Sequence, residues 1–209
     1  RFSTNFQLNF DFAQYPFDVE NFYIYAELLY PEDRYVMVLM PDYSKIDPEH
    51  GEDEFILTDF DTSVSSVIAS RDYPTSRFTF HFSAPRYKLY YLFRIFVPIL
   101  LIISVSYVTF FLNDYSKRIE VATGNLLLFI ALSWSLAEDY PRMGYLTFVD
   151  VIMVITFGIN TFVVVYNVYL KWLESHGQVE RADRIDLIAD WIYPITYISL
   201  IGATILYYF

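Results

Sequence analysis

The sequence has no cysteine among its 209 residues, and this absence removes several classes of protein at once. A chain without cysteine holds no disulfides, thiolate nucleophiles or cysteine-ligated metals. The three histidines, His50, His81 and His176, are far apart, and no serine nucleophile elbow or phosphate-binding loop is present. We therefore predict that the chain is not an enzyme, requires no cofactor, and is stabilised by packing alone.

Basic residues are also scarce. The chain carries 14 Lys and Arg against 25 Asp and Glu, which gives a formal net charge of −11. Because binding to nucleic acid needs a basic face, we expect no nucleic-acid partner. The sequence also lacks an initiator methionine and a basic-plus-apolar leader before Arg1, which predicts a piece of a longer or processed protein.

Hydrophobic residues are distributed in two different ways along the chain. Up to Arg86 they alternate with polar residues, whereas later they form runs at residues 92–112, 119–136, 146–170 and 187–209. Each run approaches the roughly 20 residues that a helix needs to cross a bilayer. We predict a four-helix transmembrane domain over residues 88–209, with helices at about 88–112, 117–138, 145–172 and 183–209.

The loops between these runs predict the orientation of the chain in the membrane. The loops at 113–118 and 171–186 hold Lys117, Arg118, Lys171, Arg181 and Arg184, whereas the loop after the second run holds only Arg142. Loops rich in Lys and Arg stay in the cytoplasm. We therefore expect residues 1–87, with their acidic excess, to lie outside the cytoplasm together with the carboxyl terminus.

Residues 1–87 have the pattern of an all-β domain. Phe78, Phe80 and Phe82 alternate with polar residues, as expected for a strand with one apolar and one wet face. Turn sequences with proline separate the strand candidates at residues 2–10, 22–29, 35–40, 55–66 and 77–83. Short strands at this spacing predict part of an immunoglobulin-like β-sandwich.

Several short motifs follow one another in a recognisable order. They are the turn Tyr15-Pro16-Phe17-Asp18 between two strands, Arg86, Tyr90-Tyr91, Pro98 in the first hydrophobic run, and Pro141. This order resembles the pentameric ligand-gated ion channels, the Cys-loop receptor superfamily, and especially its prokaryotic members. In eukaryotic members two cysteines close the loop around the turn, and those places here hold Leu8 and Phe22, as in the cysteine-less prokaryotic type.

The resemblance implies a function and a setting. Residues 1–87 would be the C-terminal part of an extracellular ligand-binding β-sandwich, and five copies of the chain would form a homo-pentamer. It implies a bacterial inner (plasma) membrane, with the N-terminal domain periplasmic or extracellular and lipid around the helices. It also implies permeant inorganic ions and a ligand that is a small molecule, a proton or calcium.

The resemblance further assigns roles to individual residues. Tyr15, Pro16, Phe17 and Asp18 would form the loop that rests on the membrane domain, Arg86 the strand-to-helix junction, and Pro141 part of the loop that receives the motion. The alternative is a structural turn with an interfacial arginine. A ligand site between subunits would take Tyr30, Arg71 and Tyr73 from this chain, although tyrosines of this kind also serve packing.

The second hydrophobic run carries a regular stripe. Glu120, Gly124, Leu127, Ala131, Trp134 and Glu138 are spaced by 4, 3, 4, 3 and 4 residues, which keeps them on one side of a helix. By resemblance this stripe lines the ion path. A packing seam is the alternative for its apolar members, but a carboxylate within a span costs about 2.5–3.5 kcal/mol at mid-membrane, which favours contact with water.

Rings of Glu120 and Glu138 predict a cation-selective pore with an apolar constriction between them. One departure from similar cation channels is that Lys117 stands beside Arg118 where those channels place an acid. In the third run we expect Asp150, Asn160 and Asn167 to form hydrogen bonds between helices rather than to bind ions.

A cluster of acids also predicts an optional metal site. Asp47, Glu49, Glu52 and Asp53 offer the oxygen ligands that calcium takes from flexible loops, so calcium is a possible modulator. The alternative is a solvated acidic loop. For the whole chain the alternative function is a membrane-anchored β-sandwich receptor or adhesion module without conductance.

Overall fold

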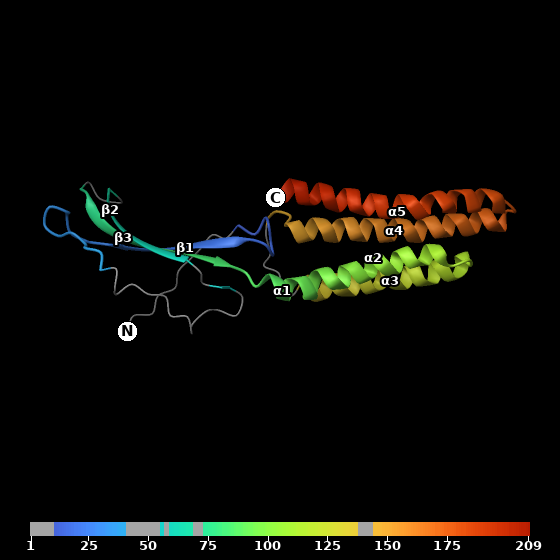
Figure 1. The fold of residues 1–209 in the computed structure, drawn as a ribbon, viewed down its shortest axis with the longest axis horizontal. Coiled ribbons are helices and arrows are strands. Elements are labelled where there is room, and N and C mark those ends of the chain that lie inside the picture. Colours follow the sequence, from blue (N-terminus) through green and yellow to red (C-terminus); the bar gives the residue numbers. More distant parts are fainter. Residues whose placement is uncertain (1–10, 41–54, 57–58, 69–72, 138–143) are drawn as a thin grey trace. The chain divides into compact units, whose positions relative to one another are not determined.

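The computed structural model describes residues 11–40, 55–56, 59–68, 73–137 and 144–209. The chain divides into two compact units. The first unit contains Arg1–Phe12 and Phe17–Tyr87, and the second contains Ala13–Pro16 and Lys88–Phe209. Figure 1 shows the strands of the first unit and the helices of the second. The strand expected at residues 2–10 lies outside the described residues.

The first unit is built on a three-stranded antiparallel sheet. Its strands are β1 (Val19–Glu27), β2 (Asp59–Val67) and β3 (Thr75–Pro85), in the order β1-β3-β2. The register places Phe22 of β1 and Phe60 of β2 opposite Phe82 of the central strand. The Phe22 and Phe82 rings stack with their centroids 4.7 Å apart. Aromatic cross-strand pairs of this kind hold the register.

The strand expected at residues 35–40 is absent from the described sheet, so this prediction was wrong. The apolar residues there follow a turn in which the Tyr35 amide donates to the Pro31 carbonyl. The Met37 amide donates to the Ser76 hydroxyl, 3.1 Å away, rather than to a backbone carbonyl. The apolar run therefore forms no ladder, because two of its backbone amides donate to a turn carbonyl and to a side-chain hydroxyl.

The first membrane-spanning segment, Lys88–Phe111, is one long helix with local changes of pitch. It consists of α1 (Lys88–Tyr91), the π-helical turn η3 (Leu92–Phe96), α2 (Val97–Val108) and the 3₁₀ turn η4 (Thr109–Phe111). Pro98 lies two residues after η3, inside this long helix, where its missing N–H removes one backbone hydrogen bond. The wider turn before it lets the Val97 amide reach the Leu92 carbonyl.

The other three segments are single helices: α3 (Tyr115–Ala137), α4 (Phe148–Ser175) and α5 (Val179–Tyr208). Asp114 caps the start of α3, because its carboxylate accepts a hydrogen bond from the Ser116 amide at 2.8 Å. This bond holds the pKa of Asp114 below its ordinary value. Thr147 and Asp150 form a capping box that begins α4. The predicted interhelical role of Asp150 was therefore wrong.

The turn between α4 and α5 is short and fully bonded. Gly177 adopts a positive φ of 77°, which glycine tolerates without strain. Its amide donates to the Glu174 carbonyl at 3.0 Å, and the Gln178 amide donates to the Leu173 carbonyl at 3.0 Å. This pair of bonds is a Schellman motif, and it ends α4 where the sequence leaves only three residues before α5.

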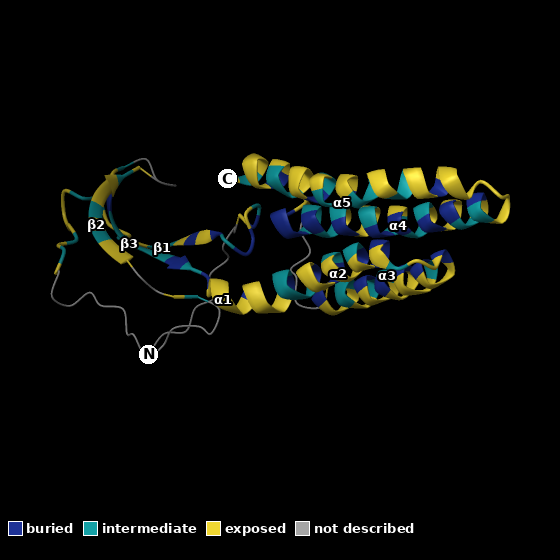
Figure 2. Cartoon of the chain, turned by 45° about the vertical axis from the view of Figure 1, so that its right-hand side comes forward, coloured by how far each residue is buried: buried dark blue, intermediate teal, exposed yellow. Residues whose placement is uncertain are grey.

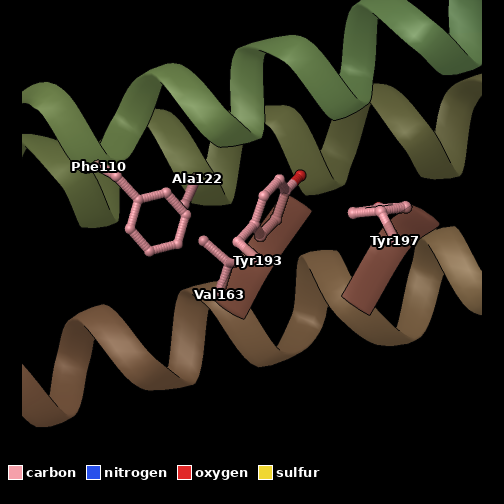
Figure 3. Close-up of a cluster of buried hydrophobic side chains, with 5 residues drawn as sticks. All are labelled: Phe110, Ala122, Val163, Tyr193 and Tyr197. Carbon is pink, nitrogen blue, oxygen red and sulfur yellow. The ribbon is translucent and has the colours of Figure 1, made fainter. Parts of the chain in front are cut away.

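The helices pack around an aromatic core that all four share. Phe110, Ala122, Val163, Tyr193 and Tyr197 form one buried cluster, with one or two members from each segment (Figure 3). The Tyr193 ring lies 5.2 Å from Phe110 and 5.1 Å from Tyr197, and its hydroxyl donates to the Ile103 carbonyl at 3.0 Å. The polar end of each buried tyrosine therefore needs a partner within the bundle.

All four segments are long and apolar enough to cross a membrane. Figure 1 shows α2 beside α3 and α4 beside α5 within this unit. A small antiparallel sheet followed by four such helices confirms the predicted fold class, and the chain is a multi-pass membrane protein.

Candidate functional site

The α3 helix has one face that is buried against other helices and one that is exposed. Arg118, Ala122, Asn125, Phe129 and Leu136 are buried against the other helices. The predicted stripe is on the other side: its five described members, Glu120, Gly124, Leu127, Ala131 and Trp134, are all exposed (Figure 2). Leu127 is 62% and Trp134 74% exposed. Among the described residues these five side chains are not buried against another helix of the same chain, which argues against a packing seam within the bundle.

Hydrogen bonds between amide side chains fix the rotation of α3. The Asn125 side-chain amide donates to the Ile102 carbonyl at 2.9 Å and to the Asn160 side-chain oxygen at 3.1 Å. Asn160 in turn donates to the Tyr197 hydroxyl at 3.4 Å. Bonds from α3 to two neighbouring segments turn Asn125 inward, and the opposite side of the helix is turned outward as a consequence.

Not every polar residue of α4 joins this network. The Asn167 side chain donates at 2.8 Å to the Val163 carbonyl one turn back in the same helix. The expected bond from Asn167 to a neighbouring helix is therefore replaced by a local one. Such back-bonding to the preceding turn is the common alternative for a short polar side chain in a membrane helix.

The first unit contains a second candidate site at the ends of its strands. The register pairs Val19 with Pro85, which brings Asp18 and Arg86 next to each other. The Arg86 Nε lies 3.1 Å from Asp18 Oδ1 and 2.9 Å from Asp18 Oδ2, and both side chains are buried. The guanidinium also lies over the rings of Phe12 and Phe55, 5.1 and 4.5 Å from their centroids.

A third charged residue at this place, Glu20, was missed by the sequence analysis. It is buried beside Asp18, and its Oε1 has no hydrogen-bond partner among the described residues. Burial and the neighbouring Asp18 carboxylate raise the pKa of Glu20 to about 7, and the Arg86 charge opposes this only in part. The alternation of β1 places residues 18 and 20 on the same face, which was the available signal.

Residues 13–16 pack within the helical unit. The Ala13 carbonyl accepts the Phe148 amide at 2.9 Å, at the first turn of α4. The Tyr15 side chain is buried, with its ring edge-on to Tyr91 at 5.3 Å. Gln14 donates to the Tyr208 carbonyl at 2.8 Å, near the end of α5. Three of the four membrane segments therefore contact this short stretch.

The remaining predicted residues are placed only in part. Tyr73 donates its hydroxyl to the Leu29 carbonyl at 3.3 Å, while Tyr30 is exposed with its ring 5.4 Å from Tyr35. Arg71, Pro141, Glu138 and the acids Asp47, Glu49, Glu52 and Asp53 lie outside the described residues. Within the described ranges no group of three or more His, Asp or Glu side chains is placed to hold a metal ion.

Comparison with known proteins shows which membrane proteins the chain resembles. No family model matches the chain. A proton-gated ion channel of Gloeobacter violaceus is 25% identical over 205 residues, which cover 95% of this chain and 56% of that protein. The chain is a relative of the pentameric ligand-gated ion channels.

Further relatives are receptor subunits of animals. A gamma-aminobutyric acid receptor subunit beta of Lymnaea stagnalis is 24% identical over 163 residues, covering 75% of this chain and 32% of that subunit. One of Caenorhabditis elegans is 26% identical over 106 residues, covering 50% and 19%. The chain therefore spans about half the length of the bacterial relative and less of the animal subunits. The resemblance inferred from the motifs is confirmed, including its cysteine-less character.

The buried Asp18–Arg86 pair gives a stability prediction. Arg86→Asp leaves Asp18 without its cation and adds a third carboxyl group beside Asp18 and Glu20, and we expect it to lower the free energy of unfolding by at least about 3–5 kcal/mol. The double variant Asp18→Arg with Arg86→Asp should recover at least half of the loss. The exposed Arg77–Glu27 pair is the matched control. Because water screens the charges there, Arg77→Asp should lower the free energy of unfolding by only about 1 kcal/mol. Equal losses at both pairs, or no recovery in the swap, would contradict the burial of the first pair. Thermal unfolding of the detergent-solubilised chain measures these values.

The raised pKa of Glu20 gives a pH prediction. The folded chain holds this proton more tightly than the unfolded chain does, so its contribution to stability is complete below about pH 4.5 and is lost as the pH rises through 7. Glu20→Gln should abolish this loss and make the chain more stable than the parent at pH 8, with the difference shrinking toward pH 4.5. Asp59→Asn, on the exposed edge strand, is the control. A constant difference between the parent and Glu20→Gln across this pH range would refute the assignment.

Proposed function

We propose that the chain is a subunit of a ligand-gated ion channel and that α3 lines its pore in a homo-pentamer. One observation carries the proposal: a helix long enough to cross a membrane leaves a straight stripe unpacked within its own chain, and a carboxylate belongs to that stripe. Around a five-fold axis the five copies of this stripe face one another. Each stripe residue then becomes a ring of five.

The composition of the stripe supports cation selectivity. Glu120, in the second turn of α3, supplies a ring of negative charge near the amino-terminal end of the helix. Further along, Leu127, Ala131 and Trp134 supply apolar rings, which stop conduction by dewetting when the pore is narrow. Selectivity and gating are thus assigned to different turns of the same helix.

The loop of residues 11–18 is the proposed coupling element. Residues 13–16 pack with the first turn of α4 and with the first membrane segment, while Asp18 is held by Arg86 at the ends of β1 and β3. Because the chain is continuous between these contacts, displacement of the strands transmits force to α4. Asn160 then connects α4 to Asn125 on the buried face of α3.

Protons are the first ligand to test. The relative in Gloeobacter violaceus is named for proton gating, and Glu20 has a pKa of about 7 beside the coupling pair. Small organic molecules and calcium are the other candidates, since the tyrosines and the acidic loop offer suitable groups. We place the channel in a bacterial inner membrane with the N-terminal domain on the periplasmic side, where it samples the external pH.

Leu127→Ser tests the gate. A hydroxyl in each copy should wet the constriction, and we expect a standing current in planar bilayers or oocytes at least about ten times that of the parent. Leu128→Ser is the matched control, because Leu128 is equally exposed, at 64%, but lies about 100° around the helix. Absence of current from the parent and both variants under acid, calcium and neutral conditions would favour the anchored receptor without conductance.

Glu120→Gln tests selectivity. On the Leu127→Ser background, which conducts without a known ligand, the reversal potential in a sodium chloride gradient should lie near the sodium equilibrium potential. Removing the Glu120 charge should move it measurably toward zero. Glu174→Gln at the end of α4 is the control and should leave it unchanged. A parent value near the chloride equilibrium potential would reject cation selectivity.

A further inference from the structure

The arginine of the Lys117–Arg118 pair is buried at the start of α3, although it stands in a sequence that predicts an exposed basic loop. Its Nη1 lies 2.6 Å from Asp186 Oδ1 of α5, and its Nε donates to the Leu112 carbonyl. The guanidinium carbon lies 5.0 Å from the centroid of the Tyr115 ring. Arg118 is therefore held on three sides, by an acid, by a backbone carbonyl and by an aromatic face.

Asp186 is held as firmly as its partner. The same Oδ1 accepts the Tyr166 hydroxyl of α4 at 3.3 Å, so one carboxylate joins α3, α4 and α5. Beside it, the Tyr115 hydroxyl donates to Asp183 at 3.4 Å, a second link between α3 and α5. On its apolar side Tyr115 belongs to a buried cluster with Leu170, Leu173 and Ala182.

Burial makes this pair sensitive to the loss of either member. A buried ion pair adds little by itself, but removing one partner leaves a desolvated charge, and this cost opposes any separation of the two helices. Arg118, the α3 member of the pair, lies in the first turn of that helix, two residues before Glu120. A separation there would rotate or tilt the end of the helix that carries the Glu120 ring.

Helical phase also separates Arg118 from the exposed stripe. Two residues span about 200° of rotation, so Arg118 and Glu120 point to nearly opposite sides of α3. The neighbouring Lys117 is exposed and has the same charge. The two basic residues that stand together in the sequence are therefore in different environments, and only one of them is neutralised by an acid of another helix.

We propose that the Arg118–Asp186 pair is a positioning contact that fixes the amino-terminal end of α3 to α5 and cancels the Arg118 charge, so that α5 sets the placement of the Glu120 ring. This inference rests on the proposed pore-lining role of α3. It assigns to α5, the helix most distant in sequence from α3, a direct hold on the end of α3 that carries Glu120. Lys117 and Glu120 then remain as the charges that ions meet.

The first experiment tests the contact without requiring conduction. Arg118→Asp and Asp186→Arg should each lower the melting temperature of the detergent-solubilised full chain by several degrees, and the double swap should recover at least half of that loss. Arg118→Lys should lower the melting temperature less than Arg118→Asp does, since lysine keeps the positive charge. Glu180→Gln, which removes an acid from an exposed pair in the same helix, should leave the melting temperature unchanged. Additive losses in the double swap would overturn the contact.

The second experiment tests the electrical consequence on the Leu127→Ser background. Arg118→Gln should change the size of the standing current at least twofold, because the helix end is released, but leave the reversal potential in a sodium chloride gradient within a few millivolts of the background. Lys117→Gln removes the same charge from an exposed position and should shift the reversal potential toward the sodium value. A larger shift from Arg118→Gln than from Lys117→Gln would overturn the proposal.

The two experiments separate this proposal from the proposed function. If no variant conducts but the charge swap recovers the melting temperature, the contact stands as a structural link and the pore-lining role of α3 fails, and the positioning proposal fails with it. If the background conducts with cation selectivity and the swap shows no recovery, the function stands and the positioning contact fails.

Discussion

The rotation of α3 about its own axis is the constraint on which the rest of the membrane unit depends. Asn125 places its amide between the Ile102 carbonyl and Asn160, and neither bond forms from another side of the helix. In hydrocarbon an amide without partners is costly, so this arrangement selects one rotation out of many. The exposure of Leu127 and Trp134 on the opposite side is its direct result.

The parts of the fold that follow from periodicity were accessible to sequence reasoning. Four apolar runs gave four helices, and the 4-3 spacing of Glu120, Leu127 and Trp134 gave a common face, because both depend only on helix geometry. The strand at residues 35–40 failed since an apolar run does not reveal whether a ladder partner is available. The turn at Pro31 and the Ser76 hydroxyl decided that locally.

The charges that the sequence analysis misjudged are those whose partners are distant in the chain. Glu20 becomes unusual only when β1 and β3 pair and bring Arg86 and Asp18 beside it. Arg118 becomes a buried residue only when α5 returns to place Asp186 against it. The local sequence pattern carries no information about either of these long-range contacts. Both sites also combine an arginine with an aromatic ring, at Phe55 and at Tyr115, which a count of charges cannot register.

The same reasoning applies to the two basic residues at the start of α3, the proposed pore helix. A sequence with Lys117 and Arg118 next to each other suggests a double positive charge at one end of a pore, which would oppose cations. Once Arg118 is paired within the bundle, the exposed charged residues between positions 114 and 120 are Asp114, Lys117 and Glu120, and only Glu120 belongs to the stripe. The sign of the field along a pore depends on helical phase and on buried pairing, since a neutralised charge contributes little at a distance. Similar cation channels place an acid next to the basic residue, where this chain has Lys117. This difference is therefore compatible with the proposed cation path lined by Glu120.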